Sequence, residues 1–588
     1  MPTPSQLDSP RRRVLIGQLL FVLLLLLLAL RMIELQVSNA RELAAASEEN
    51  RFRRVRLIPP RGEIFDRHGQ PIVVNEPVFD IGLLNSPSSP PVDEELARLS
   101  ALLGLGEEEL LARFESGRSY PYEPAILIQR ASDELLTTVA ESGFSELVIL
   151  PRPERRYLTG TVLAHAFGYL DEVRGEELSA RYRLGDLIGR KGLEAFYEET
   201  LAGIPGVKLV EVDAGERRGG LTEEQLEPTP GNHLVLGIDL TLQRRAEEIL
   251  DGRRGSIAVM NVQTGELYAL ATSPTYDPNR LGDSAYWGEL VTDPAKPLLA
   301  RVYQSTYPPG SVFKLVDATA GLLTGKVTPD GRMDQSCGGT FVYGDTAFHC
   351  WGHIGHGHLP LTEAIGWSCN VYFYQLGLRL GIEGIREYGE FYGLNEVSGI
   401  DLPHERAGEL PSIEKLEERW GQNWPRGQIC NNAIGQGSVL VNPLEMLSMY
   451  AAIANGGTLL SPRLVSRVMA PDGRLLEEPE PVVRRELDLP GWVRETLITG
   501  LRNVLRRFGA NPYGLCGKTG TSENPHGEPH AWFCAFAPST EPEVAIVIMI
   551  ENGGFGESYI KYAKELVGYV LDNELTERPA VSYLDDWR

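Results

Sequence analysis

The pattern of apolar and polar positions predicts a mixed fold of helices and strands after residue 60. Residues 93–117 and 131–143 have apolar positions at helical spacing and acidic faces, which indicates a small helical lobe. Further along, short strand-like runs alternate with longer helical stretches. We expect strands at 256–261, 266–271, 531–537 and 544–550, and helices at 311–324, 361–380, 443–455, 493–506 and 559–572. Strands at both ends of this region, with helices between them, predict an α+β fold in which helices cover an antiparallel sheet.

One apolar run near the N-terminus is long enough to cross a membrane. Residues 14–30 contain no charge and are mostly leucine, and the run extended to Ile33 spans roughly the ~30 Å hydrocarbon layer. Arg11, Arg12 and Arg13 precede it and should stay in the cytoplasm. We therefore expect a single-pass protein of the cytoplasmic (inner) membrane, with the C-terminal bulk in the periplasm or extracytoplasmic space. A cleaved signal peptide is the alternative, although the run exceeds an h-region of about 7–15 residues and no clear cleavage site follows.

Turn residues and shifts in composition predict the domain boundaries. Residues 66–69 read as a turn between two short apolar strands, the second at 71–75, and 189–194 opens a helix that runs to about Leu201. The Gly- and Pro-containing stretch 215–231 marks the main boundary. The predicted organisation is a cytoplasmic tail at 1–13, a transmembrane anchor at 14–34, a β-rich pedestal with the helical lobe at 35–230, a second folded domain at 231–575 and a C-terminal tail at 576–588.

The net charge of the chain limits the classes of partner that it can bind. The net charge is −24 over 588 residues, which argues against broad nucleic-acid binding, because that function needs basic patches to neutralise phosphates. The same charge fits a solvated domain in an aqueous compartment.

A serine and a lysine stand three residues apart behind a turn. Residues 311–314 read Ser-Val-Phe-Lys and follow Pro308-Pro309-Gly310. On a helix, positions i and i+3 share a face, so the Lys314 amine could accept the Ser311 proton if that amine is neutral. The first turn of a helix would also bring backbone N–H groups close to a reacting carbonyl. By itself the motif is more typical of the start of an ordinary surface helix.

Two further motifs follow in a fixed order. Ser368-Cys-Asn370 offers a hydroxyl that could relay a proton and an amide that could bind a substrate amide, although Ser368 alone could be a helix N-cap. Residues 518–521, Lys-Thr-Gly-Thr, lie in a strand-like stretch where a cation and a hydroxyl suit a carboxylate and Gly520 permits close approach of a substrate backbone. Each motif alone has an ordinary explanation, but the ordered trio is hard to obtain by chance.

The trio resembles the motif set of the penicillin-recognising serine enzymes. The likeness covers nearly the whole chain, because residues 61–69, 189–206 and Gln436-Gly437 before Asn442-Pro443 resemble class B penicillin-binding proteins, the monofunctional transpeptidases of peptidoglycan synthesis. No glycosyltransferase motif appears before residue 230, which favours class B over the bifunctional class. The resemblance implies a transpeptidase domain at 231–575 and a dimerisation-type pedestal at 35–230.

The resemblance implies a role for each motif residue. Ser311 would be the acylated nucleophile, Lys314 its base, and Ser368 and Asn370 the second catalytic element. Such enzymes, D-alanyl-D-alanine transpeptidases or carboxypeptidases, break a D-alanyl-D-alanine bond and pass the acyl group to an amine on a neighbouring strand.

The same resemblance implies how substrate is held. Lys518 and Thr519 would bind the carboxylate of the stem peptide or of a β-lactam, on a strand edge that Gly520 keeps open. The N–H groups of Ser311 and Thr521 would form the oxyanion hole.

Three of the six cysteines and a histidine cluster around the second motif. Cys337, Cys350, His356 and Cys369 offer three thiolates and an imidazole, a set suited to tetrahedral zinc. A disulfide or reduced core cysteines are the alternatives. This segment resembles elongation-type class B enzymes, in which a metal is held at matching positions, although cysteines stand here where some relatives use aspartates. The expected role of zinc is structural, and no cofactor is expected for the acyl transfer.

Two other cysteines have a plainer interpretation. Cys516 and Cys534 fall on neighbouring strand candidates, and we expect them to be packed core residues.

The favoured interpretation is an elongation-type peptidoglycan D,D-transpeptidase that is a β-lactam target. The resemblance implies partnership with a SEDS-type glycan polymerase of the rod-shape type and the elongation machinery. A division-specific class B enzyme, a β-lactam-hydrolysing enzyme and a catalytically silent scaffold or β-lactam sensor are the alternatives. The Cys/His cluster argues against the first, the lack of an identifiable water-activating residue against the second, and the three intact motifs against the third.

Overall fold

The computed structural model describes residues 10–34, 52–83, 93–116, 124–144, 147–179, 181–212, 218–352, 354–524 and 526–577. Most of the predicted cytoplasmic tail 1–13, much of the segment 35–60 and most of the predicted C-terminal tail 576–588 lie outside these residues.

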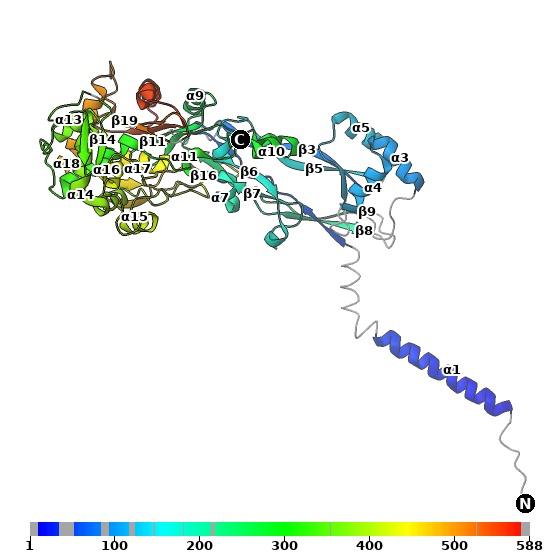
Figure 1. Cartoon of the computed structure of the whole chain (residues 1–588). Coiled ribbons are helices and arrows are strands. Elements are labelled where there is room, and N and C mark those ends of the chain that lie inside the picture. Colours follow the sequence, from blue (N-terminus) through cyan, green and yellow to red (C-terminus); the bar gives the residue numbers. More distant parts are fainter. Residues whose placement is uncertain are drawn as a thin grey trace, which may run out of the picture. The chain divides into compact units, whose positions relative to one another are not determined.

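The chain folds into two compact units, and each contains several separate segments (Figure 1). Unit 1 consists of Met1–Pro59, Pro77–Arg152 and Ile204–Thr229. Unit 2 consists of Pro60–Glu76, Pro153–Gly203 and Pro230–Arg588.

Unit 1 begins with the apolar helix α1 (Pro10–Ile33), whose residues Val14–Ile33 have exposed side chains. Among the described residues, this is the one helix long and apolar enough to cross a membrane. Its length and composition fit the predicted anchor.

Unit 1 also contains a small sheet and the predicted helical lobe. The antiparallel sheet consists of β1 (Phe52–Leu57), β8 (Gly206–Val212) and β9 (Arg218–Leu226). The lobe consists of α3 (Asp93–Leu103), α4 (Glu107–Ser116), α5 (Asp133–Glu141), β4 (Ala125–Ile128) and the parts of β3 (Pro71–Leu83) and β5 (Leu147–Tyr157) that belong to this unit. Leu99, Leu110 and Phe114 are in its core. The prediction of helices at 93–117 and 131–143 is confirmed, except that a turn at Gly104 and Gly106 divides the first.

The early segments of unit 2 join strands far apart in sequence. β2 (Ile64–Phe65) pairs in parallel with β10 (His233–Leu236), which pairs with β16 (Val465–Met469), itself paired with β17 (Leu475–Glu477). The other elements here are β6 (Tyr169–Glu172), β7 (Leu187–Lys191), α6 (Ala164–Phe167), α7 (Gly192–Phe196) and α8 (Glu198–Leu201). The helix expected from residue 189 begins only at Gly192, because residues 187–191 pair as a strand. It is also broken at Tyr197, which separates α7 from α8.

A five-stranded antiparallel sheet is the centre of unit 2. Figure 1 labels two of its strands, β11 and β19. Its spatial order is β12 (Leu267–Ser273), β11 (Gly255–Asn261), β21 (Val544–Ile550), β20 (His530–Ala537) and β19 (Cys516–Ser522). Side chains alternate between its faces. One face packs against α9 (Leu240–Leu250) and α19 (Ile560–Asp572), and the other against α17 (Pro443–Asn455). The predicted antiparallel sheet covered by helices is confirmed.

The remaining elements of unit 2 surround the α17 side of this sheet or lie on the surface. The helices are α10 (Ser284–Thr292), α11 (Arg301–Gln304), α12 (Lys314–Leu323), α13 (Leu361–Gly366), α14 (Asn370–Phe391), α15 (Ile413–Trp420), α16 (Gln428–Ala433) and α18 (Gly491–Leu505). Two separate antiparallel strand pairs complete the unit. β13 (Thr340–Tyr343) pairs with β14 (Thr346–His349) as a hairpin, and β15 (Thr458–Leu460) pairs with β18 (Val483–Glu486).

Two predicted helices are wrong in detail. The single helix expected at 361–380 is interrupted between α13 and α14, where Ser368 has a φ of 53°. The helix expected from residue 311 starts with a 3₁₀ turn, Gly310–Phe313, before α12. Both departures occur at motif residues.

Candidate active site

The turn that carries Ser311 is fixed from two sides. The indole Nε1 of Trp532 donates to the Pro308 carbonyl at 3.0 Å, and the Gly310 N–H donates to the Gly435 carbonyl at 2.8 Å. Gly310 has a φ of 59°, and a Cβ there would lie 2.9 Å from the Thr521 carbonyl oxygen. The turn therefore requires glycine for both its backbone conformation and its close packing on β19.

Lys314 begins α12 with its side chain fully buried. Its Nζ donates to Asn370 Oδ1 at 2.6 Å, to the Ser368 carbonyl at 2.9 Å and to Ser368 Oγ at 3.2 Å. Burial lowers the pKa of Lys314 to about 8, because loss of water disfavours the charged amine. Near neutral pH, Lys314 is thus far closer to a neutral base than an exposed lysine.

Ser368 is the point at which the second and third motifs meet. The Lys518 Nζ donates to Ser368 Oγ at 2.9 Å and to the Thr519 carbonyl at 2.9 Å. Ser368 Oγ is therefore bonded by two amines that lie 204 positions apart in sequence, Lys314 and Lys518. Burial, with the nearby positive charges of Lys314 and Arg507, holds the pKa of Lys518 well below its usual value.

The Ser368 backbone is not that of a helix N-cap. Cys369 occupies the N-cap position of α14, and Ser368 precedes it in the left-handed region. This strained conformation turns the Ser368 hydroxyl toward both lysines, which a regular helix from 361 to 380 would not do.

Strand β19 passes along the turn that carries Ser311. A Cβ at Gly520 would lie 2.7 Å from the Pro309 carbonyl oxygen and 2.9 Å from Trp532 Cβ. Thr519 and Thr521 are half-buried on this strand. The three motifs thus converge within unit 2, with two buried amines, a hydroxyl and an amide.

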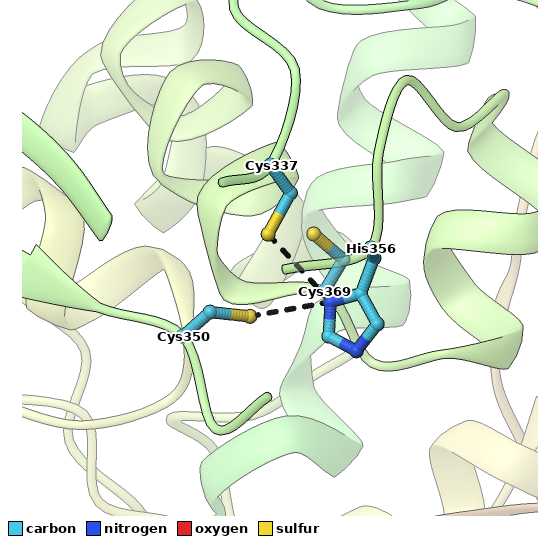
Figure 2. A group of neighbouring side chains, drawn as sticks. All are labelled: Cys337, Cys350, His356 and Cys369. Atoms are coloured by element: carbon cyan, nitrogen blue, oxygen red, sulfur yellow. Dashed lines mark hydrogen bonds between the residues drawn. The ribbon is translucent and has the colours of Figure 1, made fainter. Parts of the chain in front are cut away.

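The four predicted metal ligands come together in one cluster (Figure 2), and one of them, Cys369, directly follows Ser368 in the chain. The sulfur atoms of Cys337, Cys350 and Cys369 and a ring nitrogen of His356 all lie within 4.8 Å of one another. His356 Nδ1 is 3.4 Å from Cys350 Sγ and 3.6 Å from Cys337 Sγ. All six cysteines are free thiols, so the disulfide alternative is not formed.

The donor set of this cluster suits zinc. Tetrahedral zinc has Zn–S distances of about 2.3 Å and Zn–N distances of about 2.0 Å, which place neighbouring ligand atoms roughly 3.5–4 Å apart. Three of the four residues are buried. The hydrogen bond between Cys350 and Cys369 lowers the pKa of the Cys350 thiol and raises the pKa of the Cys369 thiol, so it favours the thiolate form at Cys350 alone. Cys516 and Cys534 lie elsewhere, fully buried in the sheet, which confirms the prediction that they are core residues.

Two side chains that support this site, Glu551 and Arg507, could not be identified from the sequence. Glu551 Oε1 accepts from Arg301 Nε at 2.8 Å and from the Tyr307 hydroxyl at 2.8 Å, just before the turn that carries Ser311. Arg507 lies over the Trp367 ring at 4.5 Å, beside Ser368. Neither Glu551 nor Arg507 belongs to a short motif, so only the folded chain reveals their positions.

Comparison with known proteins gives matches over almost the whole chain. The Penicillin binding protein transpeptidase domain matches residues 255–572, and the Penicillin-binding Protein dimerisation domain matches residues 56–236. The peptidoglycan D,D-transpeptidase MrdA of Acinetobacter baumannii is 32% identical, over 95% of this chain and 88% of its own length. The protein of the same name from Escherichia coli K12 is 28% identical, over 98% of this chain and 97% of its own.

Solved structures give the same result. The penicillin-binding protein PBP2 of Helicobacter pylori, in its complex with MreC, has a TM-score of 0.79 and 26% identity, covering 89% of this chain and 99% of that chain. A chain of a peptidoglycan synthase complex, described as coordinating polymerization and crosslinking, has a TM-score of 0.69 and 31% identity, covering 96% and 98%. With two domain matches, full-length relatives and the three motifs in order, this chain belongs to the penicillin-binding protein transpeptidase family, as a class B member of the elongation (PBP2) type.

Proposed function

We propose that this chain is a serine-type peptidoglycan D,D-transpeptidase that cross-links stem peptides during cell elongation and shape maintenance, and that β-lactams acylate the same serine. The observation that carries the proposal is the convergence of the buried amines of Lys314 and Lys518 on Ser368 Oγ. The names of the full-length relatives support the reaction, and the PBP2-type structures support the elongation role.

Acylation begins with attack of Ser311 Oγ on the carbonyl of the penultimate D-alanine. Neutral Lys314 accepts the hydroxyl proton, and Asn370, which bonds the lysine at 2.6 Å, holds the amine in place. The C–O ester bond forms, and the C–N bond to the last D-alanine breaks. Ser368, bonded to both lysines, passes a proton to the departing amine.

Groups on β19 and on the Ser311 turn would bind the two negative charges of the substrate, the terminal carboxylate and the developing oxyanion. Lys518 and Thr519 bind the terminal carboxylate, and Gly520 leaves room for the peptide backbone. The N–H groups of Ser311 and Thr521 stabilise the developing oxyanion, which is supported by the packing of Gly310 against the Thr521 carbonyl.

The second half of the reaction repeats these steps in reverse. An amine of a neighbouring stem peptide attacks the ester, the C–N bond forms, the ester C–O bond breaks, and the proton returns to Ser311. With water as the acceptor, the same site would act as a carboxypeptidase.

The Cys337, Cys350, His356 and Cys369 cluster would hold one structural Zn²⁺. When bound, the metal would supply four strong bonds that tie the segment 337–356 to the start of α14, and no proton or acyl transfer needs it. Metal analysis of protein purified without chelator tests this, and less than stoichiometric zinc in the folded protein contradicts it.

The membrane topology and the protein partners are proposed from the apolar N-terminal helix and from the similar proteins. We propose that residues 14–34 span the inner membrane with the arginines at 11–13 in the cytoplasm, so that 35–230 and 231–575 form the extracytoplasmic pedestal and transpeptidase domains. A SEDS-type polymerase and the elongation machinery are the proposed partners, supported by the similarity to a chain of a peptidoglycan synthase complex.

Labelling with a fluorescent penicillin, followed by mass mapping of the adduct, tests the chemistry. We expect a single adduct on Ser311 and none in Ser311→Ala, whereas Ser284→Ala, at an exposed serine that begins α10, should label normally. An adduct elsewhere contradicts the mechanism. Full complementation of growth by Ser311→Ala would favour a silent scaffold instead.

A further inference from the structure

A row of neighbouring, mutually tilted rings lies next to the second motif, on the surface of unit 2. Trp351 follows the proposed ligand Cys350, its ring lies 5.1 Å from that of His356, and its Nε1 donates to the Trp367 carbonyl at 2.9 Å. The rings of His356 and Trp367 are 5.8 Å apart. The row ends at Arg507, whose guanidinium lies 4.5 Å from the centre of the Trp367 ring and donates to the Gly366 carbonyl at 2.8 Å.

This row remains open to solvent although its rings are held firmly. Trp351 is 54% exposed and Trp367 is 39% exposed, and Arg507 is exposed just after the end of α18. Within the part of the chain that the structure describes, Arg507 donates to a backbone carbonyl but forms no salt bridge with a carboxylate, although Glu363 and Glu557 are near enough to act on its charge. Ordered, exposed aromatic rings beside a guanidinium that has no carboxylate partner are typical of a surface that binds a ligand with apolar and anionic parts.

The position of the row identifies the side of the reaction that it serves. The residue after Trp367 is Ser368, whose Oγ bonds Lys314 and Lys518, and Arg507 is close enough to Lys518 to lower the pKa of that amine. In the proposed mechanism, Lys518 binds the carboxylate of the D-alanine that leaves. The incoming amine must occupy the place of the departing amine, because the second half of the reaction reverses the first.

We propose that Trp351, Trp367 and Arg507 form the subsite for the acceptor, the stem peptide of the neighbouring strand. Arg507 binds a carboxylate next to the attacking amine, and the two indoles contact the apolar parts of the acceptor stem. This inference rests on the proposed transpeptidase function and specifies the acceptor, which the three motifs do not. In the transfer step, the acceptor nitrogen forms the new C–N bond, the ester bond to Ser311 breaks, and the amine proton returns to the Ser311 oxygen.

The test separates acylation from transfer in the full-length protein in detergent. A D-alanyl thioester acylates Ser311 and releases its thiol, and the acyl-enzyme then partitions between water and an added amine. Two peptides serve as acceptors, one with a free carboxylate next to its amine and one with that carboxylate amidated. The ratio of transfer to hydrolysis is measured for each, together with the rate of labelling by fluorescent penicillin.

For Arg507→Gln we expect the transfer-to-hydrolysis ratio for the free-carboxylate acceptor to fall about tenfold, as for loss of one charged hydrogen bond. The ratio for the amidated acceptor should change by less than about twofold, which a merely structural effect would not produce. Trp351→Leu should lower the ratio for both acceptors. Arg506→Gln, at the exposed arginine just before Arg507, is the matched control and should behave as the wild type.

A wild-type ratio in Arg507→Gln, or an equal fall for both acceptors, overturns the subsite. An equal loss of acylation and transfer also overturns it, because the residue would then serve the donor or the fold. If the wild-type protein itself forms no acyl-enzyme on Ser311, the proposed function fails and the subsite fails with it, so the two failures are distinguishable.

Discussion

Two buried lysines share a single serine hydroxyl in this site, and burial is the main cause of their low pKa values. Lys314 and Lys518 are fully buried and both bond Ser368 Oγ. Two ammonium groups on one hydroxyl in a dry site repel each other, so at least one amine is neutral over part of the neutral pH range. The neutral amine is the form that can accept a proton.

The pKa of Lys314 predicts the pH dependence of acylation. A lysine whose pKa is lowered to about 8 is mostly protonated at pH 6 and mostly neutral at pH 9. The rate of labelling by fluorescent penicillin should therefore rise with pH through about 8 and then level off. Circular dichroism over the same range serves as the control for unfolding. A flat profile between pH 6 and 9 would falsify Lys314 as the base.

Glu247 of α9 gives a stability prediction at the same scale. Its carboxylate accepts from the Leu163 N–H at 3.0 Å and from Gln243 Nε2 at 2.7 Å, and burial raises the pKa of Glu247 from 4.5 to about 7. Between pH 4.5 and pH 7 the folded state therefore binds more protons than the unfolded state, so stability falls as pH rises through this range. Glu247→Gln, which keeps an acceptor for both bonds, should be more stable than the wild type at pH 8 by on the order of 2 kcal/mol.

The measurement for Glu247 is the difference in melting temperature between variant and wild type at pH 4 and at pH 8. The difference should be near zero at pH 4, where the wild-type carboxyl is neutral, and clearly positive at pH 8. Glu248→Gln is the control, because the Glu248 side chain is 65% exposed and should show no such change. Equal differences at both pH values would contradict the assignment.

The motif residues could be found in the sequence, but their contacts could not. The order of Ser311–Lys314, Ser368–Asn370 and Lys518–Gly520 is a linear pattern, and so is the set of cysteines and histidines from which the metal cluster was predicted. The bond from Lys518 to Ser368 depends on tertiary folding that brings β19 to the turn before α14, and no local pattern predicts this. For the same reason Arg507 and Glu551 were missed.

At the scale of elements, helices and strands with strong periodicity were predicted well, and the errors occur where function bends the chain. The strands at 544–550 and the helix at 443–455 have the predicted bounds. The helix predicted at 361–380 is mostly apolar and contains no proline, so its pattern does not show the break at Ser368. Tertiary hydrogen bonds to Lys314 and Lys518 hold that break open against the local helical preference.

A kink inside α14, at Gly381, predicts how much stability an alanine at this position would cost. Gly381 has φ 73° and ψ 173°, a region that side chains other than glycine avoid, and a Cβ there would meet no atom within 4 Å. Gly381→Ala should therefore destabilise through backbone strain alone, by about 1–3 kcal/mol. Gly288→Ala is the matched control, since Gly288 lies in the regular helix α10 with open space around it, and should stabilise slightly. Thermal unfolding of both variants measures this, and an equal effect would mean that α14 is not kinked at Gly381.

The contact between β19 and the Ser311 turn predicts a loss of acylation without loss of any reactive group. A Cβ at Gly520 would lie within 3 Å of the Pro309 carbonyl and of Trp532 Cβ. Gly520→Ala must push the turn away from β19, and misplacement by about 1 Å is expected to slow acylation by on the order of a hundredfold. Penicillin labelling of the folded variant measures the rate, with Gly282→Ala, at an exposed glycine with open space, as control. Normal labelling of Gly520→Ala would show that the turn does not depend on β19.

At the scale of the whole chain, the two compact units are assembled from interleaved segments. Residues 60–76 and 153–203 belong to unit 2 with the large sheet, because β2 pairs with β10 and the Gly62 N–H donates to the Leu201 carbonyl. Buried Arg61 and Arg155 both bond Glu194, which closes this part of unit 2. Such pairings between distant segments cannot be obtained from local periodicity, whereas the apolar run of α1 is visible from composition alone.

Every residue assigned here to acylation lies in unit 2, whereas α1 belongs to unit 1, and this separation predicts the effect of removing the anchor. A chain lacking residues 1–34 should move from the membrane fraction to the soluble fraction, because no other described helix is long and apolar enough to span a bilayer. Its rate of labelling by fluorescent penicillin should stay within about twofold of the full-length rate, since Ser311, Lys314, Ser368 and Lys518 keep all their contacts. Growth should nevertheless fail, because in the proposed function the anchor holds the chain at the membrane beside its polymerase partner. Replacing residues 14–33 with an unrelated apolar helix is the control for anchoring alone. A truncated chain that stays with the membranes, or that folds but no longer labels, would show that the anchor does more than hold the chain at the membrane.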